Sequence, residues 1–167
     1  MHAAIVTVRE ARPSDADIFA AMVAALSVEE GVGPPGLTPS VFRRDGFGPD
    51  RRFQPLMGEL ASQPAGIALL TRGYDSHTGS AGVVLEDIYV EPHARRHGLG
   101  GALIAEAARI SADGGGCWVA WHVRRGNTRA QLFYRSLGAA SEIVDTMAIA
   151  GAPFARLAAA AASPSSL

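Results

Sequence analysis

The sequence is poor in several features that define common classes of protein. One cysteine in 167 residues excludes an intramolecular disulfide framework and a cysteine-based zinc cluster, so a reducing cytoplasm is the expected setting. Lysine is absent: all 15 basic residues are arginine, which we interpret as a coding bias. The formal net charge is -1 and no basic run exceeds two arginines, so no nucleic-acid partner is expected.

Long apolar runs are also missing. No stretch approaches the roughly 18 apolar residues of a membrane span. The first residues, MHAAIVTVREA, are typical of a strand and not of a charged leader followed by an apolar segment. We therefore expect a chain that stays in the cytoplasm and has no membrane partner.

The remaining composition favours one α+β domain over residues 3–157, followed by a frayed tail at 158–167. Apolar residues make up 48% of the chain, enough for a core. Short apolar segments bounded by turn residues predict strands, and repeats at helical spacing predict helices. Strands are expected at 54–61, 65–71, 83–90, 117–123 and 143–149, and helices after Asp15, from Thr38 to about Arg44, at 100–111 and at 128–137. The later alternation of strand and helix indicates at least one parallel crossover.

One segment, LEDIYVEPHARRHGLGGALI, combines a strand, a glycine turn and the start of a helix. The exposed N–H groups and the dipole of a helix start favour phosphate oxygens, and glycines let the backbone approach them closely. The segment lacks the Lys-Ser/Thr of a P-loop and the full GxGxxG of a dinucleotide fold. By itself it predicts either an anion site or plain packing of a turn before a helix.

A second segment, Asn127 to Ala139, follows about thirty residues later. Together with the Arg-x-x-Gly-x-Gly pattern it resembles the GNAT superfamily of acyl-CoA-dependent N-acetyltransferases. LTPSVFRRDGFG (Leu37 to Gly48) and LEDIYV (Leu85 to Val90) are similar to the diamine and thialysine acetyltransferase branch, and the resemblance extends from about Ile5 to Leu157. It implies the GNAT fold, which has a mixed, mostly antiparallel central sheet flanked by about four helices, with acetyl-CoA as co-substrate and a homodimer as the assembly.

The resemblance also implies which residues bind the co-substrate. Main-chain groups of Ile88, Tyr89 and Val90 would pair with the pantetheine arm, and Asn127 would contact the cofactor from the opposite helix. The loop and helix start that would hold the pyrophosphate comprise Arg95, Arg96, His97, Gly98, Leu99, Gly100 and Gly101. Relatives usually have glycine where Arg96 stands, so Arg96 either adds a phosphate contact or perturbs the loop.

Acetylation of an amine needs two groups that handle protons, because the amine must lose a proton and the departing thiolate must gain one. Tyr134 matches the family's general acid, and the alternative is a core aromatic residue beside Phe133. Glu86 matches a family carboxylate that takes the amine proton through water. An ordinary carboxylate, with a pKa of about 4.3, is a weak base toward an ammonium group near 10.4, so the water chain or a raised pKa has to help.

Four acids, Glu29, Asp75, Glu86 and Asp87, are candidates for binding the amine substrate. The neighbours Glu86 and Asp87 point to opposite faces of a regular strand, so both line one pocket only if a β-bulge re-aims one of them; the family's fold has a bulge on this strand. Otherwise Asp87 is solvated or pairs with an arginine. Glu29 and Asp75 match positions near a distal amine, but Glu29 also fits a solvated helix end, and His77 stands where relatives often have an aromatic residue.

Other reactive residues are expected to be structural. His93 and His97 have the spacing of a helical metal pair, but Pro92 and Gly98 place them in a loop, so no metal site is expected. Cys117 is expected to be a small buried hydrophobic residue.

The predicted function is the transfer of acetyl from acetyl-CoA directly to a primary amine of a small cationic acceptor, such as a diamine, a polyamine or a thialysine-like molecule. One alternative is the same chemistry on an amino acid, an aminoglycoside or a protein amine. The other alternative is a catalytically silent sensor that binds acyl-CoA.

Overall fold

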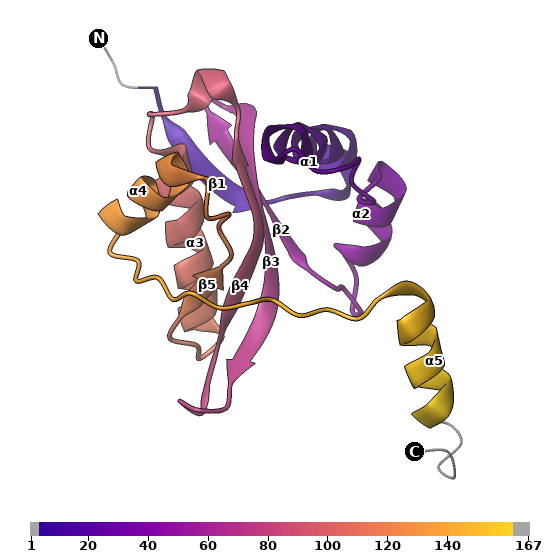
Figure 1. Ribbon diagram of the computed structural model, residues 1–167. Coiled ribbons are helices and arrows are strands. Elements are labelled where there is room, and N and C mark those ends of the chain that lie inside the picture. Colours follow the sequence, from indigo (N-terminus) through magenta and orange to yellow (C-terminus); the bar gives the residue numbers. More distant parts are fainter. Residues whose placement is uncertain (1–3, 162–167) are drawn as a thin grey trace. The chain divides into compact units, whose positions relative to one another are not determined.

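The computed structural model describes residues 4–161, which divide into a first unit that ends at Thr128 and a second that begins at Arg129. The first unit contains one sheet of five strands in the order of the sequence (Figure 1). The strands are β1 Val6–Glu10, β2 Gln54–Leu60, β3 Gln63–Asp75, β4 Ser80–Val90 and β5 Val119–Trp121. The helices of this unit are α1 Ala16–Glu30, α2 Pro39–Asp45 and α3 Leu99–Asp113, with 3-10 turns η1 Pro13–Asp15 and η2 Pro92–Ala94.

The strand pairing confirms a mixed, mostly antiparallel sheet. Strands β1 to β4 pair antiparallel, whereas β5 runs parallel to β4 after the crossover through α3. The strand predicted at 117–123 is shorter, because β5 pairs with β4 only opposite Val83–Leu85. The prediction for Cys117 is wrong. Its backbone N–H donates to Ala81 O at 3.1 Å, but its side chain, ahead of the strand, is exposed.

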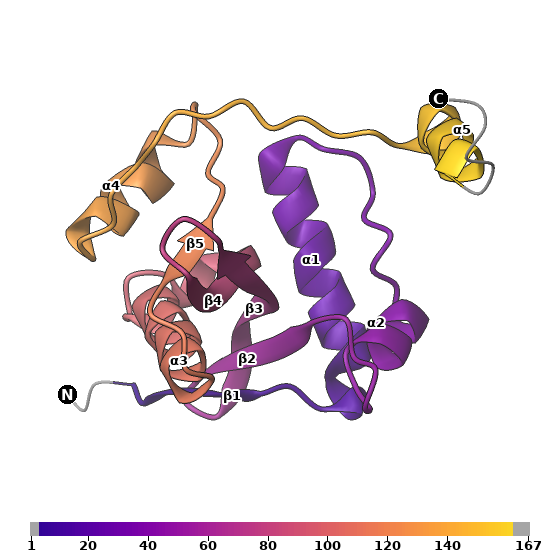
Figure 2. The same ribbon diagram turned by 90° about the horizontal axis from the view of Figure 1, so that it is seen from below.

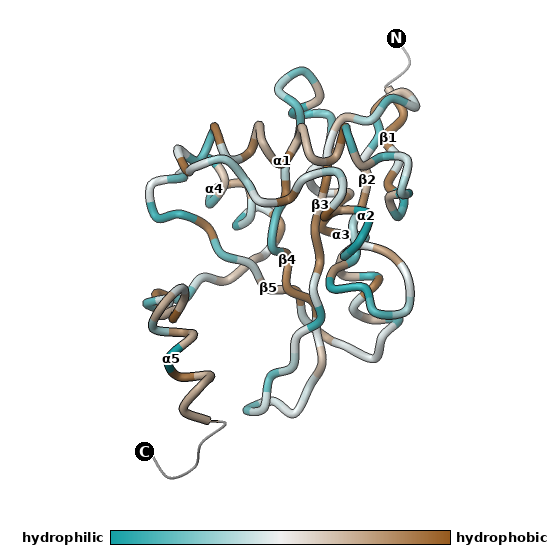
Figure 3. The backbone as a smooth tube through the Cα atoms, turned by 90° about the vertical axis from the view of Figure 1, so that its right-hand side faces the viewer, coloured by the Kyte–Doolittle hydropathy of each residue, from teal (hydrophilic) through white to brown (hydrophobic). Residues whose placement is uncertain are grey.

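Helices cover both faces of this sheet. Figures 1 and 2 show α1 and α2 on one face and α3 on the other. Two clusters of buried side chains fill these layers. The cluster on the α1 face includes Phe19, Phe42, Met57, Ile67, Leu69 and Tyr89, and the cluster on the α3 face includes Leu56, Leu70, Val83, Leu85, Leu99 and Leu103. Because residues 65–70 of β3 are buried on both sides, they form a hydrophobic stretch, coloured brown in Figure 3.

The DGFG segment, Asp45 to Gly48, forms the turn after α2. The buried Phe42 ring lies 4.6 Å from the ring centre of Phe19 and 5.3 Å from that of Phe47. A Cβ at Gly46 would meet Phe42 O at 2.8 Å, so that position excludes a side chain. Gly48 has a φ of 85°, which favours glycine. The segment that contributes to the family resemblance is therefore a packed turn.

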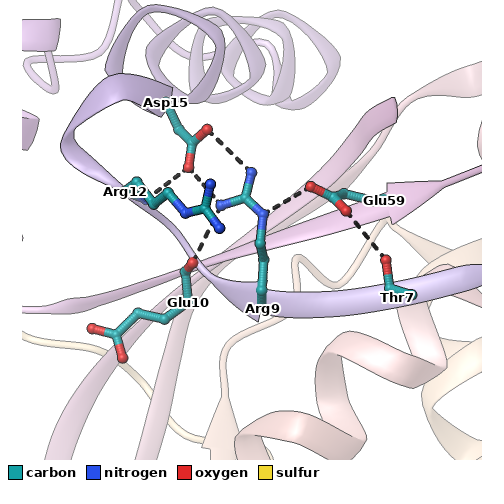
Figure 4. A network of polar contacts seen from close by, with 6 residues as sticks. All are labelled: Thr7, Arg9, Glu10, Arg12, Asp15 and Glu59. Carbon is teal, nitrogen blue, oxygen red and sulfur yellow. Dashed lines mark hydrogen bonds and ion pairs between the residues drawn. The ribbon is translucent and has the colours of Figure 1, made fainter. Parts of the chain in front are cut away.

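Polar contacts join β1, β2 and the start of α1 (Figure 4). Arg9 makes a bidentate ion pair with Asp15, with its shorter contact at 2.7 Å, and a second ion pair with Glu59 at 2.8 Å. The backbone N–H of Arg12 also donates to Asp15. The pKa of Asp15 is lowered, first by the hydrogen bond from Arg9. This network stabilises the approach of the chain to α1.

The second unit contains most of α4 Thr128–Ser136, an extended segment and α5 Gly151–Ala161. The strand predicted at 143–149 is wrong, because no described strand pairs with these residues and a strand needs a partner for its backbone groups. Ile143, Val144, Met147 and Ile149 are exposed. Residues 158–161 continue α5, whereas residue 3 and residues 162–167 of the expected domain and tail lie outside the described chain. Within residues 4–161 no helix is long and apolar enough to cross a membrane.

Candidate active site

A β-bulge in β4 brings two neighbouring carboxylates to the same face of the sheet. Leu69 lies opposite Asp87 and Leu70 lies opposite Leu85, so Glu86 is the extra residue. Asp87 shares the α1 face with Leu69, which is part of the cluster beneath that helix. The hydroxyl of Thr71, one residue beyond Leu70 and so on the same α1 face, donates to the Glu86 carboxylate at 2.6 Å. The predicted bulge is confirmed, and its effect is to place both acids on the α1 face.

Asp87 lies near the charges of two other carboxylates. It is half-buried, and its pKa is raised mainly by burial and then by the charges of Glu30 and Glu86. Within residues 4–161, no arginine or hydroxyl contact to Asp87 offsets this repulsion. A cation bound here would stabilise the ionised carboxylate, so this part of the face is suited to a positively charged ligand.

The end of α1 adds to this negative character. Glu29 and Glu30 occupy its last turn, which contains no basic residue, and the helix dipole is negative at this end. Two arginines from separate loops compensate for them: Arg95 pairs with Glu29, and Arg124 pairs with Glu30 at 3.6 Å. Glu29 is thus an exposed residue at the helix end that pairs with Arg95.

The edge of β4 that faces β5 is unpaired beyond Leu85. The two strands pair only at Val83–Leu85, although β4 continues to Val90. Along residues 86–90 no strand of the described chain lies on that side, while β3 still pairs with the other edge as far as Val90. Ile88, Tyr89 and Val90 therefore lie on an edge whose backbone is open to an extended ligand.

The start of α3 has the features of an anion site. Its N-cap is Gly98, in the left-handed conformation with a φ of 87°, and no side chain caps the helix. A Cβ at Gly98 or Gly101 would meet no atom within 4 Å, so this turn faces open space. Leu99 fixes its position, because the side chain packs over Gly58 and Gly66, where a Cβ would lie 2.8 Å and 3.2 Å from Leu99 carbons. The geometry suits phosphate oxygens.

Arg96 adopts a glycine-like backbone. Its φ is 68°, in the left-handed region, and its side chain is exposed. A glycine at this position would avoid the strain that a side chain brings there. Both parts of the expectation for Arg96 therefore have a structural basis: the backbone is strained, and the guanidinium is available on the loop that precedes α3.

Asp75 does not join the other acids. It ends β3 at the tip of the β3–β4 hairpin, about 13 Å along the strand from Thr71 at ~3.3 Å per residue. Its carboxylate accepts hydrogen bonds from the backbone N–H of His77 at 2.8 Å and from the Thr78 hydroxyl at 2.9 Å. These bonds lower its pKa. Asp75 and His77 together form a hairpin turn.

Tyr134 lies on α4, where it is half-buried and its ring centre is 5.3 Å from that of Phe133. Asn127 immediately precedes α4, and its backbone N–H donates to Arg124 O at 2.9 Å. His93 and His97 are exposed residues between β4 and α3, and the described chain contains no cluster of three potential metal ligands. The parts assigned to Tyr134 and Asn127 in the reaction remain predictions.

A cavity of about 640 Å³ lies near the base of the β3–β4 hairpin. Three arginines, Arg51, Arg52 and Arg72, line it together with the end of α3. Thr71 borders both this cavity and Glu86. The arginines make the cavity a poor match for a cationic ligand, in contrast to the face around Asp87.

Two functional features were missed in the sequence. Glu30 lies beside Glu29 but acts on Asp87, and Thr71 binds Glu86 from the neighbouring strand. Thr71 lies opposite Val84, and Glu86 follows Val84 by two residues along β4. A correct strand register would therefore have placed Thr71 near Glu86. Glu30 had no comparable signal, because its relation to Asp87 depends on the packing of α1 on the sheet.

Known proteins resemble the chain in both sequence and structure. The sequence profile described as "Acetyltransferase (GNAT) family" matches residues 23–139. The thialysine N-epsilon-acetyltransferase of Bos taurus is 30% identical over 145 residues, covering 81% of this chain and 85% of the relative. A V. cholerae integron cassette protein has a TM-score of 0.73 at 18% identity, over 92% of this chain and 97% of its own. An aminoglycoside N-acetyltransferase in complex with CoA has a TM-score of 0.72 at 21% identity, over 89% and 97%. The two structural likenesses show a shared fold.

Proposed function

The chain belongs to the GNAT family of acetyltransferases and is an acetyl-CoA-dependent N-acetyltransferase; from that premise we propose that its acceptor is a primary amine of a small cationic molecule. The observation that carries this proposal is the bulge that places Glu86 and Asp87 together on the α1 face, where the charge of Glu30 also acts on Asp87. A second ammonium group on the acceptor, as in a diamine, a polyamine or a thialysine-like amino acid, would lower the repulsion at Asp87. The bovine relative, named for thialysine, supports the same acceptor class.

The donor site that we propose uses the open edge of β4 and the start of α3. When bound, acetyl-CoA supplies the activated acetyl group. Main-chain groups of Ile88, Tyr89 and Val90 are assigned to the pantetheine arm, and Asn127 is assigned a further contact. The pyrophosphate is assigned to the loop from Arg96 to Gly101, whose uncapped helix start and open glycines fit an anion. No metal is required for the proposed step.

Two residues are assigned to proton transfer. Glu86, exposed and hydrogen-bonded to Thr71, accepts the amine proton through water, and Asp87 holds the cationic substrate nearby. Tyr134 donates a proton to the departing thiolate. Changing Tyr134→Phe is expected to lower kcat by roughly 100-fold or more. Binding of CoA, measured by calorimetry, should stay within about twofold, and an unchanged kcat would remove Tyr134 from this role.

The acceptor proposal is tested with two amines that differ by one ammonium group. We expect kcat/KM for putrescine to exceed that for butylamine by about tenfold, the effect of one additional charge contact. Asp87→Asn should reduce this ratio, whereas Asp75→Asn, a change of the same charge at the hairpin tip, should leave it unchanged. Equal kcat/KM for the two amines would contradict selection of a second ammonium group and favour another amine acceptor. Tight CoA binding without transfer to any amine would favour the silent sensor.

A homodimer in the cytoplasm is the proposed state of the enzyme. The extended segment after α4 exposes Ile143, Val144, Met147 and Ile149, between 59% and 90% each. Large apolar side chains on an unpaired extended segment favour pairing with another chain, here a second copy of this one. Light scattering on the purified protein should give twice the mass of one chain. A single-chain mass at micromolar concentration would contradict the dimer.

A further inference from the structure

Arg95 lies between the proposed phosphate loop and the end of α1. Its Nε donates to the backbone O of Val90 at 2.8 Å, which joins the loop to the last residue of β4. Another nitrogen of the same guanidinium pairs with the Glu29 carboxylate. The guanidinium carbon lies 5.7 Å from the ring centre of Tyr89. All three contacts are made by one side chain that is 22% exposed.

The contacts of this side chain lie on the α1 side of the sheet. Tyr89 belongs to the buried cluster on the α1 face, and Glu29 lies on α1 itself. The first turn of α3 packs on the other face, through Leu99. The Nε and one terminal nitrogen of the Arg95 guanidinium are therefore engaged by Val90 O and by Glu29 on the α1 side.

The pairing is also favourable on electrostatic grounds. Glu29 occupies the last turn of α1, where the helix dipole disfavours a negative charge, and that turn contains no basic residue. Arg95 supplies the missing cation. The planar guanidinium can hold a carboxylate and a carbonyl at once and still stack on a ring, so it fixes the loop more firmly than a single-point contact does.

We propose that Arg95 is a positioning residue. Through Glu29 and Val90 O it holds the loop before α3 in a fixed position relative to α1 and β4, and thereby sets the geometry in which the start of α3 binds the phosphates of acetyl-CoA. This inference rests on the proposed use of the α3 start for acetyl-CoA. It assigns Arg95 and Glu29 one joint role, in place of a phosphate ligand and a substrate ligand.

A double-mutant cycle tests the inference, because the two possible roles of Arg95 predict effects of opposite sign. If Arg95 positions the loop, Glu29→Gln and Arg95→Gln should each raise the Kd for CoA and the KM for acetyl-CoA by about three- to tenfold. The double variant should be no weaker than the weaker single variant, and kcat at saturation should stay within about twofold. If Arg95 contacted phosphate directly, Glu29→Gln would free the guanidinium and lower the Kd.

Matched controls come from an ion pair on the far part of α3. Glu106 and Arg109 are 2.6 Å apart, and Glu106→Gln and Arg109→Gln remove the same charges without touching the loop. These variants should bind CoA like the wild type. Melting temperatures of all variants should agree within about 2 °C, so that the Kd reports on the site.

Each outcome has a defined meaning. Failure of the wild-type protein to bind CoA overturns the proposed donor site and this inference with it. Binding by the wild type, with Glu29→Gln unchanged or tighter, overturns the inference alone. Effects of the two single variants that add in full also overturn it, because additivity excludes a joint role.

Discussion

Replacing Arg96 separates backbone strain from phosphate binding at one position. Arg96 has a φ of 68°, and a left-handed residue other than glycine costs roughly 1–2 kcal/mol. Glycine removes that strain but adds about 0.4–1 kcal/mol of conformational entropy to the unfolded chain. We therefore expect Arg96→Gly to increase the free energy of unfolding by about 0.5–1 kcal/mol. For a chain of this length that corresponds to a rise in Tm of about 1–4 °C.

The same change removes an exposed guanidinium from the loop before α3. One charged contact to phosphate at an exposed site is worth about 1 kcal/mol, so KM for acetyl-CoA should rise roughly fivefold. This difference should shrink at high salt, because added ions screen exposed charges. The stabilised variant should thus be the weaker enzyme at low acetyl-CoA.

Arg96→Ala is the matched control, since alanine removes the guanidinium but keeps the strained φ. Both variants should share the change in KM, and only the glycine variant should gain stability. The assays are thermal melting followed by circular dichroism, and initial rates over a range of acetyl-CoA at two salt concentrations. A Tm that rises equally for alanine, or falls for glycine, would refute the strain assignment. An unchanged KM in both variants would refute the phosphate contact.

Three further changes test other parts of the structure. Asp87→Asn should lower activity but stabilise the fold by about 0.5–2 kcal/mol at pH 7, because the raised pKa of Asp87 means that its ionised form is disfavoured in the folded state. This gain in stability should vanish below the ordinary carboxyl pKa, and chemical denaturation at about pH 7 and pH 3 checks it. Asp15→Asn should cost about 1–2 kcal/mol at pH 7. Because the folded pKa of Asp15 is lowered, the difference from wild type should begin to shrink below about pH 3.8 and disappear once the pH has fallen through the folded pKa; a constant difference would contradict the role of the Arg9 pair. Phe42→Ala should cost about 3–5 kcal/mol in urea denaturation, since a fully buried ring is lost, and a cost under 1 kcal/mol would contradict its central place in the aromatic cluster.

The sequence predicted the parts of the site that depend on local pattern. The conflict between alternation and the neighbouring acids Glu86 and Asp87, read together with the family resemblance, indicated a bulge, and the strand register contains one at that point. Glycine spacing indicated the turn before α3, where Gly98 has a positive φ. Both features follow from the period of a strand and from the steric limits of a side chain, which are readable in one segment.

Features that depend on distant segments could not be read in this way. Arg95 and Glu29 are 66 residues apart, and their pairing depends on how α1 packs on the sheet. The alternation of apolar residues at 143–149 is typical of a strand, but pattern alone does not supply the partner that a strand requires. Glu30 was missed for the same reason, since it influences Asp87 through space.

Release of thiol from acetyl-CoA by the purified protein tests the central claim most directly. The assay compares putrescine, spermidine, lysine, thialysine and an aminoglycoside with a control that contains no amine, and mass spectrometry identifies the acetylated product. We predict that thiol is released together with an equal amount of N-acetylated product for one of the small, compact cations, and that the control is silent. Release without an acetylated amine, or no release with any amine by a protein that binds CoA, would contradict direct acetyl transfer to a small cationic acceptor.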